Sequence, residues 1–183
     1  MTTNNPSDIL LYGTQEDSIV DGPGLRFCIF TQGCKHNCPG CHNPESQNLE
    51  GGYKASLESL YEEIRANKII QGVTFSGGEP LLQTRACLAL AKQLSQQGFN
   101  IWLYSGYLYE DIMGGSLGSE ARELLSYCDV LVDGPFIESL HVYDLLWRGS
   151  TNQRVIDIKK SAQAGQVTLW ESHDDYPTAP SSW

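Results

Sequence analysis

The sequence predicts an α/β fold, built as an open, partial β/α barrel around a mostly parallel sheet. Segments typical of buried strands alternate with segments of helical spacing along the 183-residue chain. This order favours parallel strands joined by right-handed helical crossovers. A closed barrel of eight such units takes about 250 residues, so the chain is long enough for only part of one.

Six segments have the composition of strands. The first four are mostly apolar and end in turn residues, whereas the last two are weaker candidates. In chain order they cover residues 25–31, 69–75, 100–105, 129–133, 153–158 and 166–170.

Apolar residues at helical spacing appear between these segments. Ser56 is expected to cap the first helix, Gly98 to end the second and Ser119 to cap the third. The helices are expected from residue 56 onward, over 84–97 and over 119–127, with a short helical or turn segment around 159–165.

Domain organisation and charge limit the possible functions. We expect one domain over residues 1–170 and a flexible tail over residues 171–183. The chain carries 22 acidic against 12 basic residues, and it lacks the clustered Lys and Arg that nucleic-acid binding requires. No apolar run reaches the ~18 residues that span a membrane, and residues 1–7 are polar rather than signal-like. We therefore expect a cytoplasmic protein.

Three of the six cysteines lie in one short segment. Cys34, Cys38 and Cys41 have C-x3-C-x2-C spacing. Three thiolates can hold three irons of a four-iron cubane and leave the fourth iron free to bind a substrate or cofactor. The other cysteines lie singly among apolar residues and are expected to be structural thiols. They are Cys28, Cys87 and Cys128.

The same segment also allows a zinc site. Zinc would take the three thiolates and either His36 or His42 as its fourth ligand, because Cys3His sites are common. The spacing taken alone leaves this alternative open.

Two motifs together resemble the radical S-adenosylmethionine (SAM) superfamily. The C-x3-C-x2-C segment follows the first predicted strand, and Gly77-Gly78-Glu79-Pro80 follows the second, in the order typical of that superfamily. The resemblance implies a partial, TIM-like barrel of the radical SAM type. It also implies a [4Fe-4S] cluster with one iron that no cysteine binds, and SAM on that iron.

The resemblance also implies which residues bind these groups. Cys34, Cys38 and Cys41 would be the cluster ligands. No catalytic residue is implied beyond the cluster and SAM. The implied SAM contacts are Gly77, Gly78 and Glu79 at the methionine amino group, and Gly40, Cys41 and His42 beside the adenine.

Two further positions lie near the carboxyl ends of predicted strands, where parallel α/β sheets bind ligands. Ser105, between Tyr104 and Gly106, is expected to contact the SAM ribose or adenine. Asp133 ends the fourth strand. Asp133 and Arg148 are expected either near the SAM or partner site or as structural or solvated charges.

Four segments narrow the resemblance to the activating proteins of glycyl-radical enzymes, and among these to those of anaerobic ribonucleoside-triphosphate reductases. They are residues 20–26, 38–43, 131–136 and 147–153. This resemblance implies an oxidoreductase that cleaves SAM at a reduced cluster and generates a glycyl radical near the C-terminus of the reductase large subunit. It implies a flavodoxin- or ferredoxin-like electron donor. From the acidic charge balance and the short apolar runs, we expect neither a nucleic acid nor a membrane as partner.

Other functions stay open at this point. Within the same chemistry, the chain could be a pyruvate formate-lyase-type activase or a 7-carboxy-7-deazaguanine synthase. Outside it, the three thiols could form a non-enzymatic zinc or iron-sulfur site.

Overall fold

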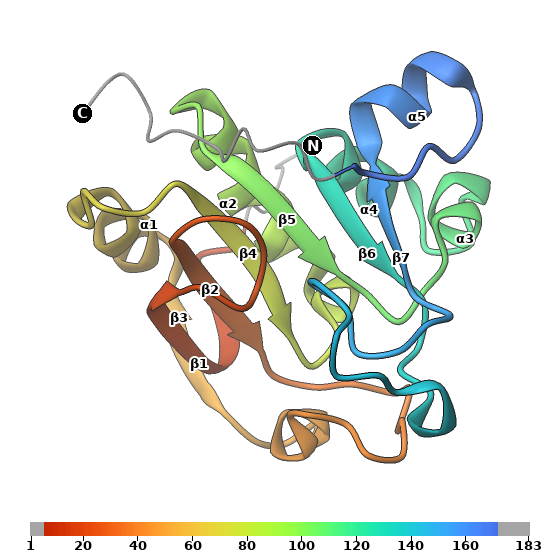
Figure 1. The fold of residues 1–183 in the computed structure, drawn as a ribbon. Coiled ribbons are helices and arrows are strands. Elements are labelled where there is room, and N and C mark those ends of the chain that lie inside the picture. Colours follow the sequence, from red (N-terminus) through yellow and green to blue (C-terminus); the bar gives the residue numbers. More distant parts are fainter. Residues whose placement is uncertain (1–5, 172–183) are drawn as a thin grey trace.

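The computed structural model describes residues 6–171. One seven-stranded sheet, in the order β3-β1-β2-β4-β5-β6-β7, carries helices on one of its faces (Figure 1). Its strands are β1 (Asp8–Ser18), β2 (Arg26–Thr31), β3 (Tyr53–Ser56), β4 (Gly72–Gly77), β5 (Asn100–Tyr104), β6 (Val130–Asp133) and β7 (Arg154–Asp157). Its helices are α1 (Leu57–Ala66), α2 (Thr84–Gln96), α3 (Tyr109–Gly114), α4 (Ser119–Ser126) and α5 (Ile158–Ala164), with 3-10 turns η1 (Pro44–Gln47), η2 (Pro80–Gln83) and η3 (Glu138–Leu140). The predicted α/β class and the open sheet are confirmed.

The four central strands run parallel. β2 pairs with β4, β4 with β5 and β5 with β6, and each of these strands corresponds to a predicted segment. The edges are antiparallel, because β1 pairs with β2 and β3, and β7 pairs with β6. A barrel of the radical SAM type stays a prediction.

The sequence pattern did not reveal β1, β3 or α3. β1 is largely polar in its second half, and β3 is mostly exposed, so neither has the apolar pattern of a buried strand. Both form because they pair with a neighbouring strand, and such tertiary context commonly overrides local propensity. The strand predicted over residues 166–170 is wrong: this segment forms an isolated bridge between Ile156 and Leu169 and no ladder, although the Trp170 ring packs against Trp102 of β5.

The helix boundaries test the predicted caps. Ser56 caps α1 as expected, because its side chain accepts a hydrogen bond from the Ser59 N–H. Gly98 follows the end of α2 with a φ of +84°, a conformation that favours glycine. Ser119 is not the cap of α4, since Gly118 takes that position and Ser119 is the first residue of the helix.

The sheet has two chemically different faces, because successive strand residues point to opposite sides. The face under the helices, called the helix-covered face, is apolar and fully buried. It carries Phe27, Ile29, Val73, Phe75, Ile101, Leu103, Leu131 and Ile156. The other face, called the open face, mixes charged, polar and aromatic side chains. It carries Arg26, Cys28, Thr74, Trp102, Tyr104, Val130 and Val132.

Arg26 lies in the open face with no exposed surface. Its Nε donates to Thr74 Oγ1 at 2.6 Å, and its terminal nitrogens donate to oxygens of Val73 and Asn100. The guanidinium also lies 5.4 Å from the ring centroid of Trp102. Burial lowers the pKa of Arg26 to about 10. Because Thr74 Oγ1 donates in turn to the Asp21 carbonyl at 2.8 Å, this network fixes the turn before β2.

The flexible tail predicted over residues 171–183 lies outside the described residues, apart from Glu171. Within residues 6–171, no helix combines the length and the apolar composition that crossing a membrane requires.

Candidate functional site

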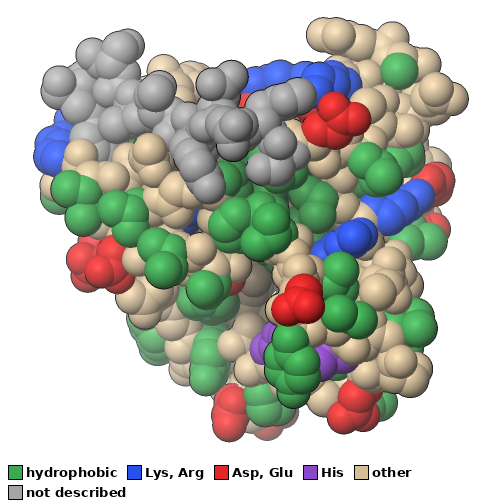
Figure 2. Space-filling model, viewed as in Figure 1, with side chains coloured by type: hydrophobic (Ala, Val, Ile, Leu, Met, Phe, Trp, Pro, Cys, Tyr) green, Lys and Arg blue, Asp and Glu red, His purple; other side chains and the backbone are tan. Residues whose placement is uncertain are grey.

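A cavity of about 560 Å³ lies at the carboxyl ends of the parallel strands. This volume falls in the range of small-molecule sites. Histidine and hydrophobic side chains gather at a hollow on the open face (Figure 2). The cavity brings together residues from the two sequence motifs and from the end of β5. They include Cys34, Cys38, Cys41, Gly77, Gly78 and Ser105.

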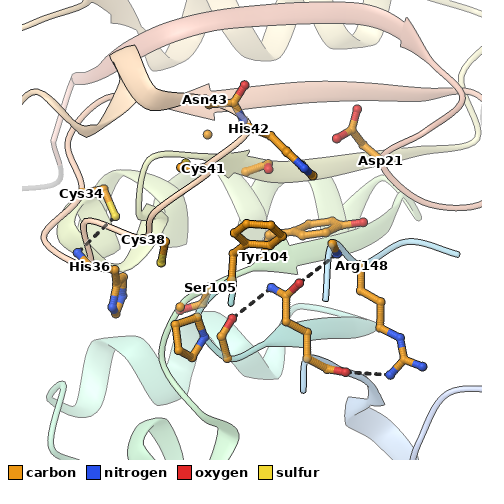
Figure 3. A pocket seen from close by; sticks show the side chains of 18 of the residues that line it. Asp21, Cys34, His36, Cys38, Cys41, His42, Asn43, Tyr104, Ser105 and Arg148 are labelled. Carbon is orange, nitrogen blue, oxygen red and sulfur yellow. Dashed lines mark hydrogen bonds between the residues drawn. The ribbon is translucent and has the colours of Figure 1, made fainter. Parts of the chain in front are cut away.

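The cysteine loop begins where β2 ends. Its three thiols are free, partly exposed and directed to the cavity, with Tyr104 across from them (Figure 3). Asn37 and Gly40 have positive φ values of 49° and 70°, which turn the loop tightly enough to gather the cysteines. Partial burial raises the pKa of Cys34 and of Cys38 above the usual thiol value.

The three thiols of the cysteine loop are the candidate ligands of a metal centre. Among the described residues, no three His, Cys, Asp or Glu side chains are grouped so as to hold one metal ion. Zinc needs its ligands to converge on one point, whereas in a cubane each thiolate binds a different iron. The donor set, three thiols from one loop beside a roomy cavity, therefore fits a [4Fe-4S] cluster.

The expected structural thiols are placed as predicted. Cys28, Cys87 and Cys128 are buried and lie outside the cavity lining. Burial raises the pKa of each of them well above the usual thiol value.

The glycine turn after β4 packs directly against the start of the cysteine loop. Gly78 N–H donates to the Thr31 carbonyl and Glu79 N–H to the Gly33 carbonyl, both at 2.8 Å. A Cβ on Gly77 would lie 2.5 Å from the backbone nitrogen of Thr31, and one on Gly78 would collide with the Gly33 carbonyl. Both glycines are thus required for the two motifs to touch, a reason that the sequence did not reveal.

Glu79 follows this turn but is 1% exposed and does not line the cavity. Its Oε2 accepts from Gly106 N–H at 2.8 Å and contacts His36 Nε2 at 3.0 Å. Its Oε1 accepts from Leu81 N–H at 3.0 Å, and Ser105 Oγ donates to the same carboxylate. The structure therefore gives Glu79 a full set of protein partners, and its predicted contact with SAM stays a prediction.

The end of β5 faces the cavity with three successive residues. Tyr104, Ser105 and Gly106 all line it, and the predicted contact of Ser105 with SAM stays a prediction. Burial raises the pKa of Tyr104, so its hydroxyl stays protonated. Ser105 Oγ also accepts from Tyr107 N–H at 3.1 Å, which holds the chain as it leaves the strand.

An aromatic group borders the cavity next to Cys41. The His42 ring lies 5.2 Å from that of Phe136 and 5.7 Å from that of His141, which lies 4.7 Å from the ring of Tyr143. His141 Nδ1 lies 2.6 Å from the Gly149 carbonyl, which fixes the imidazole. His42 and Cys41 line the cavity, whereas the predicted contact Gly40 does not.

The structure places Asp133 and Arg148, whose roles the sequence left open, in two different environments. Asp133 is fully buried, accepts from Tyr109 N–H at 2.8 Å and forms an ion pair with Arg154. Arg154 also pairs with Glu110, whose pKa it lowers. Arg148 instead lines the cavity and donates to the Gln153 carbonyl at 2.7 Å. Asp133 thus forms a buried ion pair away from the cavity, and Arg148 lies at the cavity.

Several cavity residues could not be selected from the sequence. His141 and Tyr143 belong to the long segment between β6 and β7, which has no periodic pattern, and Phe136 ends the segment 131–136, which the sequence singled out without giving Phe136 a role. Asp21 and Ser76 offered a weak signal, because they lie in a turn before β2 and near the end of β4.

Comparison with known proteins gives concordant matches. Residues 20–156 match the family described as a 4Fe-4S single cluster domain. Two similar relatives are the anaerobic ribonucleoside-triphosphate reductase-activating proteins of Salmonella typhi and Escherichia coli K12. Each is 34% identical over 145 residues, which cover 75% of this chain and 91% of the relative. The protein of that name from Enterobacteria phage T4 is 36% identical over 142 residues, covering 74% of this chain and 86% of its own.

Proposed function

The chain belongs to the family of anaerobic ribonucleoside-triphosphate reductase-activating proteins and contains a 4Fe-4S cluster domain, and from this premise we propose that it is a radical SAM activase. Its substrate is a glycine near the C-terminus of the reductase large subunit. Residues 1–170 form one domain, a partial TIM-like barrel of the radical SAM type. The parallel strands β2, β4, β5 and β6 with their helical crossovers support that assignment.

One observation carries the proposal. Three partly exposed thiols from one loop line the same cavity as the glycine turn and the end of β5. Cys34, Cys38 and Cys41 would hold three irons of the cluster, which leaves one iron for SAM. When bound, the reduced cluster and SAM would supply the radical chemistry that removes a hydrogen atom from glycine.

The residues around the cavity would bind and orient SAM. A methionine ammonium needs acceptors, and Gly77 and Gly78 line the cavity with backbone that has no side chain to block an approach to its carbonyls. Glu79 supplies a negative charge beside them. Ser105 offers a hydroxyl to the ribose or adenine, and His42 offers a flat surface to the adenine.

The open sheet and the cavity mouth support a protein substrate. Val20, Val142 and Tyr143 line the cavity and are also exposed, Tyr143 to 92%. Exposed apolar residues grouped around a cavity are typical of a contact surface. Glycine suits the reaction, because it has no side chain to block the approach of the radical.

The remaining assignments follow from this chemistry. The cluster needs a low-potential electron donor, which we propose to be flavodoxin- or ferredoxin-like. Six cysteines without a disulfide among the described residues fit a reducing compartment, and we propose the cytoplasm.

Anaerobic reconstitution with iron and sulfide, followed by reduction and addition of SAM, tests the proposal. We expect 5′-deoxyadenosine, and a glycyl-radical signal in electron paramagnetic resonance when the anaerobic reductase is present. Pyruvate formate-lyase, supplied in its place, serves as the control and should give no signal. If no 5′-deoxyadenosine forms, the radical SAM assignment fails. If it forms without a radical on the reductase, only the assignment of the partner fails.

A further inference from the structure

His36 lies in the middle of the cysteine loop, and the proposed function gives it no role. Its side chain is 20% exposed, although its two neighbours in the loop, Lys35 and Asn37, are exposed. The ring turns inward to the Glu79 carboxylate, with Nε2 3.0 Å from Oε2. Within the described residues, His36 is therefore the side chain that ties the segment between Cys34 and Cys38 to the body of the protein.

The partner of His36 is itself rigidly held. Glu79 receives hydrogen bonds from Leu81 N–H, Ser105 Oγ and Gly106 N–H. A carboxylate with these donors acts as an acceptor, so we assign the proton of the His36 contact to Nε2. Within residues 6–171, no Lys or Arg forms an ion pair with Glu79. His36 is thus the one basic side chain that the described structure places on this buried carboxylate.

The end of β5 is shaped to receive the ring. A Cβ on Gly106 would lie 2.5 Å from His36 Cδ2 and 2.6 Å from Nε2, so the imidazole can approach only because residue 106 is glycine. The Tyr107 ring packs against the imidazole edge-on, with centroids 4.6 Å apart. The His36 ring therefore packs into a site formed by Glu79, Gly106 and Tyr107.

We propose that His36 is a positioning residue that docks the cysteine loop onto Glu79 and the end of β5. This inference rests on the proposed function. Because His36 is two residues from both Cys34 and Cys38, its anchoring restrains both thiols at the cavity. An anchored loop loses less conformational freedom when the thiols bind iron, so the cluster is held more tightly.

The test measures how firmly the cluster is held, independently of turnover. Wild type and variants are reconstituted anaerobically, and the release of iron to an excess of chelator is followed by absorbance. His36→Ala removes the anchor, and Gly106→Ala displaces the ring without changing His36. His36→Gln keeps an N–H donor at a similar reach. Lys35→Ala, in the same loop but exposed, is the matched control.

We expect His36→Ala and Gly106→Ala to release iron about 10-fold faster than wild type, the scale typical of residues that orient metal ligands. Lys35→Ala should behave as wild type, and His36→Gln should recover most of the loss. The thermal midpoint of each apo protein is measured alongside, because a general loss of stability would lower it. For His36→Ala we expect an unchanged midpoint.

The outcomes separate the two proposals. If wild type takes up no cluster, the proposed function fails and the inference falls with it. If wild type holds its cluster and His36→Ala releases iron at the wild-type rate, only the positioning role is overturned. The role is also overturned if His36→Gln releases iron as fast as His36→Ala, because the N–H donor would then be irrelevant.

Discussion

The two faces of the sheet are built from the same strands but have different roles. On the helix-covered face, Phe75 and Leu103 are fully buried in one apolar core. On the open face, the neighbouring residues Thr74 and Tyr104 form hydrogen bonds or line the cavity. The period-2 alternation of a strand thus separates stability from binding, residue by residue. Substitutions of core residues such as Phe75 should change the free energy of unfolding, whereas substitutions of cavity residues such as Tyr104 should change the binding of the cluster and SAM.

The largest expected effect is the loss of the cluster, which should follow the replacement of a loop thiol but not of a buried thiol. Replacing Cys34, Cys38 or Cys41 singly by alanine should abolish a stable [4Fe-4S] cluster, since each holds a different iron. Cys87→Ala is the matched control, because Cys87 is buried in the helix-covered core and donates to the Pro80 carbonyl. It should keep its iron and lose about 1 kcal/mol of stability. Iron and sulfide analysis with urea unfolding checks both, and a full cluster in Cys38→Ala would contradict the ligand set.

The next largest effect is expected for Asp133→Asn, which should change the free energy of unfolding alone. Its carboxylate is buried and paired with Arg154, so Asp133→Asn leaves a weakened pair and should lower the free energy of unfolding by about 3 kcal/mol. Because Asp133 does not line the cavity, the affinity of the cluster-loaded variant for SAM should be unchanged. Urea unfolding and calorimetric titration with SAM measure the two quantities. A large loss of affinity would return Asp133 to the site.

Alkaline pH should weaken the fold through the buried thiols. Burial raises the pKa of Cys87 and Cys128, so the folded chain keeps their protons where the unfolded chain releases them, above about pH 8.5. The unfolded state then binds fewer protons, and stability falls as the pH rises, by up to about 1.4 kcal/mol per pH unit for each thiol. Urea unfolding of the reduced apo protein at pH 8 and 9.5 should show the loss. The double variant Cys87→Ala/Cys128→Ala should show a shallower decline, and an equal slope would refute the cause.

Ser105→Ala should have the smallest of these effects, and the quantity that it changes is the affinity for SAM. The change removes a hydroxyl from the cavity wall and a donor to Glu79, so we expect SAM affinity to fall about 10-fold, or about 1.4 kcal/mol. Ser126→Ala is the control, because Ser126 is exposed on α4 and donates only to the Glu123 carbonyl. Titration of the cluster-loaded proteins with SAM compares them. Equal affinities would remove Ser105 from the site.

The same contrast explains what the sequence could reveal. The central strands and the helices over them were predictable, because Phe75 and Leu90 belong to local apolar patterns that a single core selects. β3 was not, since its residues are mostly exposed and it exists through its pairing with β1. Residues 166–170 have a strand-like composition, but they pair with the sheet at one bridge and not along a ladder.

The site was predictable only where a motif carries its own spacing. The cysteines and the glycine turn could be read from the sequence, and the structure brings both to one cavity. The His36 contact with Glu79 joins residues 43 positions apart, and it depends on Gly106 having no side chain. No local sequence pattern encodes this contact, because it forms only when the carboxyl ends of β2, β4 and β5 lie side by side.

The backbone hydrogen bonds from Gly78 to Thr31 and from Glu79 to Gly33 have a consequence for engineering. The cysteine segment is not a portable module. A synthetic peptide spanning residues 33–42 would carry Cys34, Cys38 and Cys41 and yet lack the strand-end carbonyls and amides that shape the loop. A minimal scaffold built to carry this loop needs the three adjacent parallel strands β2, β4 and β5, with the glycine turn after β4 and the end of β5 included, so the smallest transplantable unit extends from β2 through Tyr107.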